Sequence, residues 1–230
     1  MLLHELYFDC LGAADPMTPA MALGLHANFT SVERWREEFM VMGKALGGGS
    51  GWVLLMFQPR EGSLVNQWAA DHTHAVAGGV PLLALDMYEH SYHMDFGAAA
   101  GQYVEAFMEN INWTRVYERY QAAVEASSGA YAAVADDLAG ARVLDVRRAG
   151  VFEQADALIP GAEWRDPGQV SSWCAQLPQD KPVVVYCVYG HEVGRTTAMR
   201  LRAAGVNAKF LRGGIDGWKS AGRPLTSKSS

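Results

Sequence analysis

Two short runs of β-branched residues, RVLDV at 142–146 and PVVVYC at 182–187, constrain the fold of the chain most strongly. Each run is typical of a buried strand, and each is followed by a polar turn and a helical pattern, as in GRTTAMRLRAAG at 194–205. This βαβ order predicts parallel strands in one sheet with helices on its faces. NAKFL at 207–211 predicts a third strand, and RGGIDGWKSAG at 212–222 predicts a glycine turn leading into a short helix.

The first half of the chain predicts a different architecture. SVERWREEFMVMGKALG at 31–47 has a serine N-cap, apolar residues at helical spacing and a glycine stop. GSGWVLLMFQPREGSLVNQWA at 49–69 predicts two strands joined by a Pro-Arg-Glu-Gly turn. GQYVEAFMENI at 101–111 predicts another helix. Helices beside a small antiparallel sheet indicate an α+β unit.

The composition changes near residue 121, which suggests two domains. Six of the seven histidines precede this point. The Ala-rich stretch QAAVEASSGAYAAVADDLAGA at 121–141 contains a Ser-Ser-Gly break, which predicts the end of a helix, a short linker and the start of a new helix. Since 230 residues exceed a typical single domain of roughly 100 to 200 residues, we expect one domain at 1–125 and a second at 130–226.

Charge and hydropathy exclude several classes of protein. The formal net charge is −6 and no basic stripe occurs, so we expect no binding to nucleic acid. The chain opens without the pattern of a signal peptide, and no run reaches the ~18 apolar residues of a membrane span, so we expect a cytoplasmic protein with no membrane partner. Three widely spaced cysteines, Cys10, Cys174 and Cys187, form neither a disulfide framework nor a CxxC zinc site.

Asp86 and His90 stand four residues apart, directly after the apolar run VPLLALD at 80–86. A buried carboxylate is costly unless it is paired or bound to a metal. From the spacing alone two interpretations stay open. In one, Asp86 caps a turn and His90 is a hydrogen-bonded core histidine; in the other, both are metal ligands.

Three segments of the first half resemble the C-terminal domain of iron/manganese superoxide dismutases, over roughly residues 1–121. They are GSGWVLLMF, VPLLALDMYEHSYHMDF and YVEAFMENINWTRVYERY. That family binds one metal ion through three histidines and one aspartate, and the resemblance implies that Asp86 and His90 are two of these ligands. HELYFDCLG is similar to the helix that carries another ligand, which implies His4. The resemblance thus implies one iron or manganese ion per chain, superoxide as substrate, and a homodimer formed through this domain.

The same resemblance implies residues around the metal. Glu89 falls on the family's glutamate that reaches across the dimer interface to the ligand histidine of the partner. His72, within AADHTHA, falls where family members place a Gln or His that hydrogen-bonds the metal-bound solvent. Tyr88 stands in place of the family's pocket tryptophan. Outer hydrogen bonds of this kind tune the potential of a redox metal and its bound water.

One ligand of the family has no counterpart here. The family's first ligand histidine and a nearby tyrosine lie on an N-terminal helix, which this sequence lacks. Either the true start lies upstream, or the domain is degenerate and is kept for packing or dimerisation. A start in mid-helix leaves core surface uncovered, which favours the first explanation. A further histidine, such as His26, His74 or His93, could also complete the site.

Cys187 ends the second predicted strand and precedes a loop and a helix that begins near Gly194. Consecutive backbone N–H groups that lead into a helix form a cradle for an anion, and a cysteine at its mouth is expected to have a lowered pKa. Such a thiolate is a nucleophile. The alternative is a buried and inert cysteine. Cys10 and Cys174 have no such setting, so we interpret both as structural.

Residues 130–225 resemble the rhodanese sulfurtransferases. The resemblance rests on VLDVRRAGVFEQADALIPGA and LRGGIDGWKSAGRPL. It implies that Cys187 accepts a sulfane sulfur as a persulfide and passes it to a thiol or to cyanide, and that Asp145 and Arg147 have a structural role. The substrate loop would comprise Val188, Tyr189, Gly190, Val193 and Arg195, with His191 and Glu192 as catalytic residues.

Glu192 departs from the rhodanese pattern, because typical members carry arginine at this sixth position of the loop. A carboxylate there repels anions. Arg195 either compensates for Glu192 or faces solvent, and His191 could donate a proton or hold the thiolate. We therefore expect thiosulfate to be a poor donor, and a protein persulfide or neutral polysulfide to be a better one.

Two functions compete. The first is a bifunctional enzyme of oxidative or metal-oxyanion stress that joins a metal domain to a sulfurtransferase. The second is a sulfurtransferase or redox sensor whose first half is a metal-free dimerisation module. The proposed ligand set suits iron and manganese equally.

Overall fold

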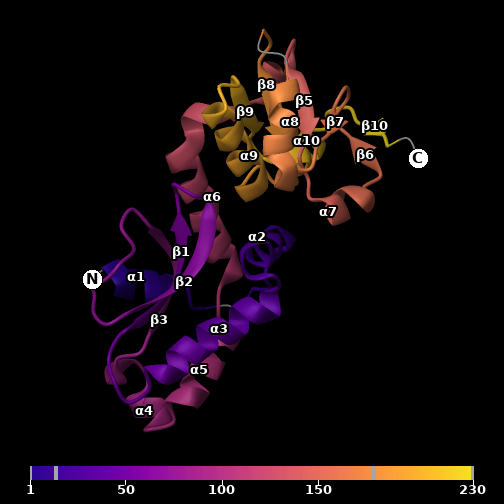
Figure 1. Cartoon of the computed structure of the whole chain (residues 1–230). Coiled ribbons are helices and arrows are strands. Elements are labelled where there is room, and N and C mark those ends of the chain that lie inside the picture. The colour runs from indigo at the N-terminus through magenta and orange to yellow at the C-terminus, as the bar shows by residue number, and fades with distance from the viewer. Residues whose placement is uncertain (1, 13–14, 178–179, 229–230) are drawn as a thin grey trace. The chain divides into compact units, whose positions relative to one another are not determined.

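The computed structural model describes residues 2–12, 15–177 and 180–228 (Figure 1). The chain divides into two compact units, Met1–Ser127 and Ser128–Ser230. In these described ranges, no helix combines the length and the apolar composition needed to cross a membrane. The predicted domain boundaries at 125 and 130 stay a prediction.

The first unit is an α+β fold. Its elements are α1 (Leu2–Asp9), α2 (Pro19–Phe29), α3 (Val32–Ala45), β1 (Trp52–Gln58), β2 (Ser63–Ala69), β3 (Val80–Asp86), η1 (Glu89–Ser91), α4 (His93–Phe96), α5 (Ala100–Glu109) and α6 (Trp113–Ser128). The three strands form an antiparallel sheet in the order β2-β1-β3. The predicted architecture of helices beside a small antiparallel sheet is confirmed.

Local sequence explains where the helices begin. The Ser31 hydroxyl accepts a 3.0 Å hydrogen bond from the backbone N–H of Arg34 and so caps α3. Thr18 caps α2 in the same way, with Pro19 at the first helical position, where its missing N–H costs nothing.

The core of the first unit forms around β1, which is buried from Trp52 to Phe57. Helix α3 approaches the sheet closely at Gly43, where a Cβ atom would lie 2.9 Å from Cδ2 of Leu85. Helix α1 packs against β3. This packing brings the N-terminal helix beside the carboxyl end of β3, where Asp86 stands.

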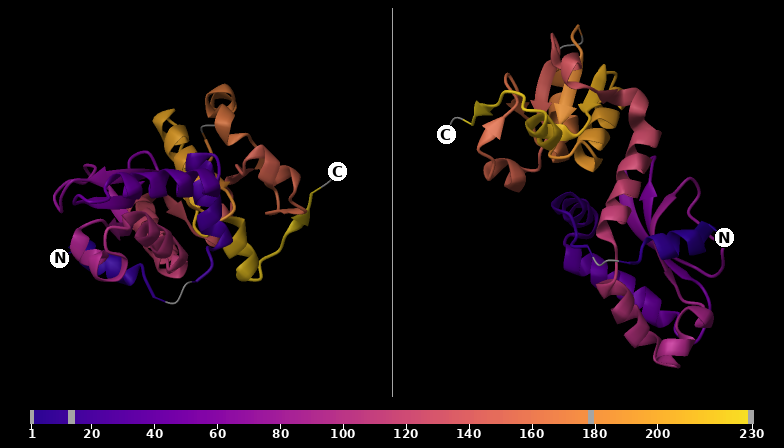
Figure 2. Two further views of the ribbon diagram at one scale, coloured as in Figure 1. Left: turned by 90° about the horizontal axis from the view of Figure 1, so that it is seen from below. Right: turned by 180° about the vertical axis from the view of Figure 1, so that it is seen from behind.

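The second unit is an α/β fold. Its elements are η2 (Gly129–Tyr131), β4 (Ala132–Ala133), η3 (Ala135–Leu138), β5 (Arg142–Asp145), α7 (Ala149–Glu153), β6 (Ala157–Leu158), β7 (Glu163–Trp164), η4 (Pro167–Gln169), α8 (Val170–Trp173), η5 (Cys174–Gln176), β8 (Val183–Tyr186), α9 (Glu192–Ala203), β9 (Ala208–Leu211), α10 (Gly214–Ser220) and β10 (Thr226–Ser227). Five strands form a parallel sheet in the order β4-β9-β8-β5-β7, and β6 pairs separately with β10. The predicted parallel sheet is confirmed, and Figure 2 shows each unit with its own sheet from two further sides.

Strand β8 is buried on both faces. Val183 and Val185 pack in one apolar cluster with residues of α8 and α9, whereas Val184 and Tyr186 pack in a second cluster with Ile215 of α10. This alternation follows from the two-residue period of a strand. Cys187 directly follows the carboxyl end of this strand, whose two faces are both covered.

One expectation for the linker is wrong. After the Ser-Ser-Gly break the structure has two 3₁₀ turns, η2 and η3, and the short strand β4, instead of a new helix. Ala132 and Ala133 pair with Phe210 and Leu211 of β9. Pairing with a sheet edge therefore overrides the helical preference of alanine in this segment.

Candidate functional site

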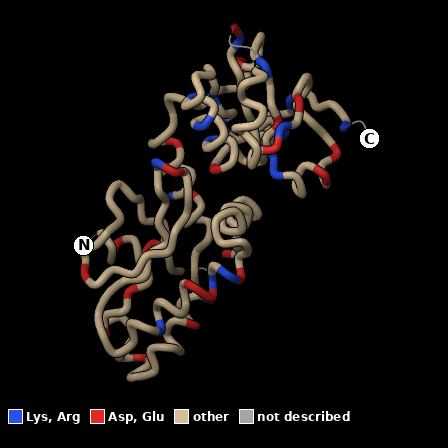
Figure 3. The backbone as a smooth tube through the Cα atoms, viewed as in Figure 1, with Lys and Arg blue, Asp and Glu red and all other residues tan. Residues whose placement is uncertain are grey.

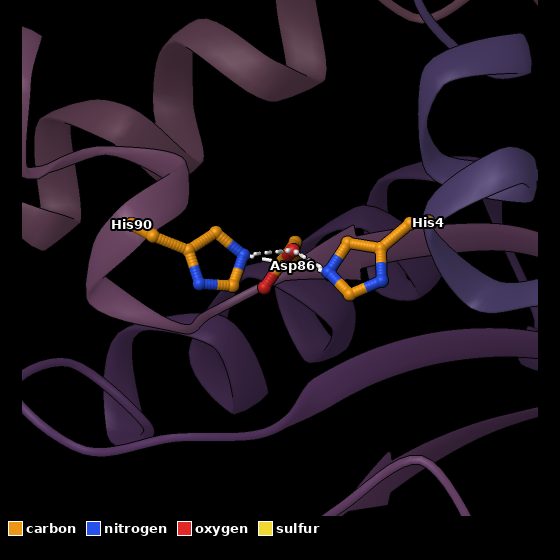
Figure 4. A group of neighbouring side chains, drawn as sticks. All are labelled: His4, Asp86 and His90. Atoms are coloured by element: carbon orange, nitrogen blue, oxygen red, sulfur yellow. Dashed lines mark hydrogen bonds and ion pairs between the residues drawn. The ribbon is translucent and has the colours of Figure 1, made fainter. Parts of the chain in front are cut away.

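His4, Asp86 and His90 converge in the first unit (Figure 4). Their elements are α1, the last residue of β3 and η1. The two imidazole Nε2 atoms each lie 3.3 Å from Oδ2 of Asp86 and 3.4 Å from one another. The three predicted metal ligands are thus brought together from segments more than eighty residues apart.

The donor atoms fit a single metal ion. Since the three separations are 3.3, 3.3 and 3.4 Å, a point near the centre of the triangle lies about 2 Å from each atom, the usual distance from a transition metal to imidazole or carboxylate. Two neutral imidazoles and one carboxylate are a donor set that suits iron and manganese. Asp86 is only 1% exposed, so its charge needs a cationic partner.

Asp86 is held in place by its own chain and by a neighbouring helix. The backbone N–H of Tyr88 donates to Oδ1 of Asp86 over 2.9 Å, which leaves Oδ2 directed at the two histidines. The hydroxyl groups of Ser91 and Tyr103 each donate to the Asp86 carbonyl over 2.8 Å. The Tyr103 hydroxyl also lies 3.1 Å from that of Tyr7, and burial raises the pKa of both tyrosines.

His72 and Tyr88 lie beside this cluster. The Trp52 indole N–H donates to Nδ1 of His72 over 2.9 Å, so a neutral His72 carries its proton on Nε2. The ring of His72 lies 5.3 Å from that of His4 and stacks on Tyr88 at 5.2 Å, and Tyr88 stacks in turn on His90 at 5.7 Å. The roles of both residues around a metal stay predictions.

The other predicted residues of this unit lie outside the cluster. Glu89 is exposed, and its predicted contact with a partner subunit stays a prediction. His26 lies in the last turn of α2, His93 begins α4, and His74 lies 3.9 Å from Asp71. Among the described residues, the donor cluster holds only His4, Asp86 and His90, so none of the three candidate histidines completes it.

In the second unit, Cys187 follows β8 and lies at the base of a loop that leads into α9. Its side chain is 6% exposed. The backbone N–H groups of Tyr189, Gly190, His191 and Gly194 all hydrogen-bond to the Cys187 sulfur. Each of these hydrogen bonds acts to lower the pKa of the thiol, against the effect of burial. The predicted cradle of consecutive N–H groups is therefore present.

Two glycines are required by the shape of this loop. Gly190 has φ +71°, and a Cβ atom there would lie 2.5 Å from the carbonyl oxygen of Leu211. Gly214 has φ +57°, and a Cβ atom there would clash with the carbonyl oxygen of Val188 and would lie 2.5 Å from that of Cys187. The N–H groups of Ile215 and Asp216 donate to those two carbonyls over 3.0 Å. The start of α10 therefore fixes the base of the loop.

The expected lowering of the Cys187 pKa is wrong. Burial is the largest effect and raises the pKa of the thiol above its ordinary value of 9.0, and the four N–H donors only partly oppose this. Desolvation could not be foreseen from the loop motif, because it depends on the residues that cover Cys187 in three dimensions. Burial likewise raises the pKa of Cys10 to about 11.

His191 and Glu192 occupy the end of the loop and the start of α9. Burial lowers the pKa of His191 to about 4, so its imidazole is neutral at neutral pH. Oε1 of Glu192 lies 3.4 Å from Nη2 of Arg148, which offsets the carboxylate charge. Arg195 is 3% exposed, so it does not face solvent.

The other loop residues are placed as follows. The carbonyl of Val188 accepts the hydrogen bond from Asp216, and the ring of Tyr189 stacks at 6.5 Å on that of His191. Val193 packs against the apolar cluster of α8 and α9.

Asp145 and Arg147 form a buried ion pair in the second unit. The Arg147 guanidinium contacts both carboxylate oxygens of Asp145, and its Nη2 also donates to the Ala157 carbonyl over 3.1 Å. The Tyr186 hydroxyl donates to Oδ2 of Asp145 over 3.0 Å and accepts the N–H of Ile159. The pair therefore joins β5 and β8 to the segment that follows α7.

Two residues of these sites were not anticipated from the sequence. Arg148 lies 3.4 Å from Glu192. The sequence feature that could have indicated this contact is the pair of arginines directly after a predicted strand. The carboxyl ends of parallel strands share one edge of a sheet, so residues that follow them lie close together. Trp52 orients His72, but it lies in a continuous apolar run that gives no signal of a polar role.

Comparisons with known proteins agree with both units. Residues 17–119 match the family "Iron/manganese superoxide dismutases, C-terminal domain", and residues 130–221 match the family "Rhodanese-like domain". A superoxide dismutase [Fe] of Cupriavidus metallidurans is 62% identical over 54% of this chain and 63% of its own length. A superoxide dismutase [Mn] of Halobacterium salinarum is 37% identical over 54% and 62%, and a superoxide dismutase [Fe] of Aquifex aeolicus is 32% identical over 55% and 59%. The chain spans about six tenths of the length of these relatives.

The first unit holds the cluster of His4, Asp86 and His90. The second unit holds the cysteine loop, which follows strand β8 of the parallel sheet. The chain consists of an iron/manganese superoxide dismutase C-terminal domain followed by a rhodanese-like domain.

Proposed function

We propose that this protein is a sulfurtransferase, in which Cys187 carries sulfane sulfur as a persulfide, joined to a domain that holds one iron or manganese ion. Small sulfur donors and thiol acceptors would be the substrates of the second domain, and superoxide that of the first. The protein would act in the cytoplasm, as a homodimer through its first domain, against oxidative or metal-oxyanion stress.

The observation that carries sulfur transfer is the set of four backbone N–H groups at the Cys187 sulfur. In the first step the Cys187 thiolate attacks the sulfane sulfur of a donor, and the donor's bond to that sulfur breaks with its electron pair. In the second, an acceptor attacks the outer sulfur and the pair returns to Cys187. Fixed N–H donors stabilise the anionic sulfur in both states without reorganisation.

The charges around the loop support a donor other than thiosulfate. Residues 128–230 carry 13 of the 19 Lys and Arg residues and 10 of the 25 Asp and Glu residues, so this unit has a positive balance (Figure 3). Within the loop, however, Glu192 presents a carboxylate that Arg148 offsets. A neutral imidazole at His191 adds no positive charge. We therefore expect a protein persulfide or a neutral polysulfide to be used more readily than a dianion such as thiosulfate.

A steady-state assay tests sulfur transfer, with polysulfide as donor and cyanide as acceptor. Cys187→Ser should reduce the rate to that of the uncatalysed reaction, because the nucleophile is lost. Cys174→Ser is the matched control, since Cys174 lies on η5 and contacts the Ser171 carbonyl. Full activity in Cys187→Ser would contradict the proposal.

The donor triangle of His4, Asp86 and His90 favours redox-metal chemistry as the function of the first unit. When bound, an iron or manganese ion supplies the one-electron chemistry that dismutation needs. Asp86 would balance the charge of the ion, and His72, oriented by Trp52, would direct its Nε2 proton toward a bound ligand. The alternative is a metal-free dimerisation module.

Metal content per chain separates these two alternatives. Protein produced with iron and manganese supplied should contain about one ion per chain, and His90→Ala should lose it. His93→Ala is the control, because His93 begins α4 outside the cluster. Folded protein without metal would instead support the dimerisation module.

A further inference from the structure

Two buried tyrosines, Tyr7 of α1 and Tyr103 of α5, bring their hydroxyl groups together beside the carboxyl end of β3. The two hydroxyl oxygens lie 3.1 Å apart, and that of Tyr103 lies 2.8 Å from the carbonyl oxygen of Asp86. Because both side chains are buried, bulk water competes little for these hydrogen bonds. No step of the proposed metal chemistry uses the Tyr7–Tyr103 pair.

The hydrogen bonds of the pair run in one direction. Each hydroxyl has a single proton and keeps it at neutral pH, since burial raises the pKa of both tyrosines above the usual value of about 10. The Tyr103 proton is donated to the Asp86 carbonyl, so the Tyr7 proton completes the hydrogen bond between the two phenols. A chain of hydrogen bonds therefore leads from α1 through α5 to the last residue of β3.

Tyr7 shares a face of α1 with His4, because residues three apart in a helix are neighbours on its surface. The Tyr7 ring also stacks on Phe107 of α5, at a centroid distance of 6.0 Å. One turn before Tyr7, His4 directs its Nε2 at Oδ2 of Asp86 over 3.3 Å. A movement of Tyr7 relative to β3 would therefore move His4 with it.

The three ligands of the cluster differ in how the chain connects them. Asp86 and His90 stand four residues apart in one short segment, and the backbone N–H of Tyr88 fixes Oδ1 of Asp86 within it. His4 comes from a separate helix, more than eighty residues away in the sequence. The position of His4 therefore depends on contacts between α1 and the rest of the unit.

Hydrogen bonds hold α1 from two sides. At its last residue, Nη2 of Arg119 donates to Oδ2 of Asp9, and Nη1 of Arg119 donates to the Leu82 carbonyl, both over 2.6 Å. Asp9 follows Tyr7 by two residues, so the two side chains point about 200° apart around the helix axis. Loss of the Tyr7 hydroxyl would leave the Arg119 side fixed and would free the face that carries His4.

We propose that the Tyr7–Tyr103 pair positions His4 against Asp86 and so determines how tightly the cluster holds a metal ion. This inference rests on the proposed metal binding of the first unit. Both tyrosines are positioning residues, since they act through the ligands. The separation of 3.3 Å between the donor atoms of His4 and Asp86 lets one ion lie about 2 Å from each of them. Loss of a hydrogen bond outside the ligand shell typically lowers metal affinity about 10- to 100-fold.

Tyr7→Phe tests the pair most selectively, because it removes one hydroxyl and keeps the hydrogen bond from Tyr103 to Asp86. Co²⁺ is the probe, since it binds such sites more tightly than Mn²⁺ or Fe²⁺ and its visible absorption reports on its ligands. We expect one Co²⁺ per full-length chain, and binding about tenfold weaker in Tyr7→Phe. Tyr92→Phe is the matched control: Tyr92 is buried, stacks on Tyr103, and accepts the N–H of Gly48 over 3.3 Å.

A measurement on the metal-free protein separates positioning from metal binding. The imidazole of His4 meets the Trp52 indole edge to face, with ring centroids 5.0 Å apart. The nuclear Overhauser effect between these two rings should weaken in Tyr7→Phe and persist in Tyr92→Phe, because only the first variant frees His4.

The two readouts give distinct outcomes. Equal Co²⁺ affinity in Tyr7→Phe and Tyr92→Phe would overturn the inference alone. So would a tenfold loss of affinity with an unchanged nuclear Overhauser effect, since Tyr7 would then act other than through His4. If the native chain binds no Co²⁺, iron or manganese while the effect is lost in Tyr7→Phe, the proposed metal binding fails and the positioning of His4 stands.

Discussion

Gly194 lies so close to Cys187 that a Cβ atom on it would stand 3.2 Å from the Cys187 sulfur. The backbone N–H of Gly194 also hydrogen-bonds to that sulfur. The absence of a side chain on the first turn of α9 therefore lets the helix backbone approach the nucleophile. The close approach at Gly194 therefore supplies one of the hydrogen bonds that stabilise the Cys187 thiolate.

Gly194→Ala should slow sulfur transfer, because the new methyl group pushes the N–H away from the thiolate. We expect a loss of about tenfold, since one fixed donor to an anionic sulfur is weakened. Steady-state transfer to cyanide measures it. Gly150→Ala is the matched control, as a Cβ there meets nothing within 4 Å. Equal rates in the two variants would show that the close approach has no catalytic effect.

Arg147→Met should destabilise the second unit strongly, because it leaves the buried carboxylate of Asp145 without its cation. Removal of one partner from a buried pair costs about 3 to 5 kcal/mol. Hydrogen exchange of the β8 amides in the full chain reports the loss for this unit.

The comparison for that experiment is Arg142→Met. Arg142 pairs with Glu163 over 2.6 Å, but these side chains are 34% and 46% exposed, and exposed pairs contribute less than about 1 kcal/mol. Similar losses of protection in the two variants would contradict a structural role of the buried pair.

His191 should make the second unit less stable in mild acid. Burial holds the pKa of His191 at about 4, against 6.5 for an unperturbed histidine. The unfolded chain binds a proton below pH 6.5 and the native chain only near pH 4, so this contribution is complete above pH 6.5 and is lost as the pH falls toward 4.

Between pH 7 and pH 4.5 the native protein should lose about 2 to 3 kcal/mol more unfolding free energy than His191→Gln. Hydrogen exchange at several pH values, corrected for the intrinsic exchange rate, measures this difference. Identical pH dependence in the two proteins would show that His191 is not held neutral by burial.

The sequence was sufficient to predict those elements whose signals are local. Ser31 as a cap, the turn between β1 and β2, and the β-branched runs around β5 and β8 all follow from neighbours in the chain, and the structure confirms them. Ala132 and Ala133 show the limit, since their strand depends on the distant edge of β9. Periodicity and propensity contain no information about such a partner.

The candidate sites likewise contain residues that the sequence indicated and contacts that it did not. The resemblance to two families was enough to bring His4, Asp86 and His90 into one set and to single out Cys187. The direction of the Cys187 pKa shift, the contact of Arg148 with Glu192 and the indole that orients His72 were not predictable, because each depends on tertiary packing.

Sulfur transfer through Cys187 is tested most directly by the mass of the intact protein after treatment with polysulfide and removal of excess donor. We expect a gain of one sulfur atom, about 32 Da, located on Cys187 by peptide mapping and released by a thiol. The gain should persist in Cys174→Ser and vanish in Cys187→Ser. A protein that gains no sulfur, or gains it on Cys10 or Cys174, would contradict the proposed function.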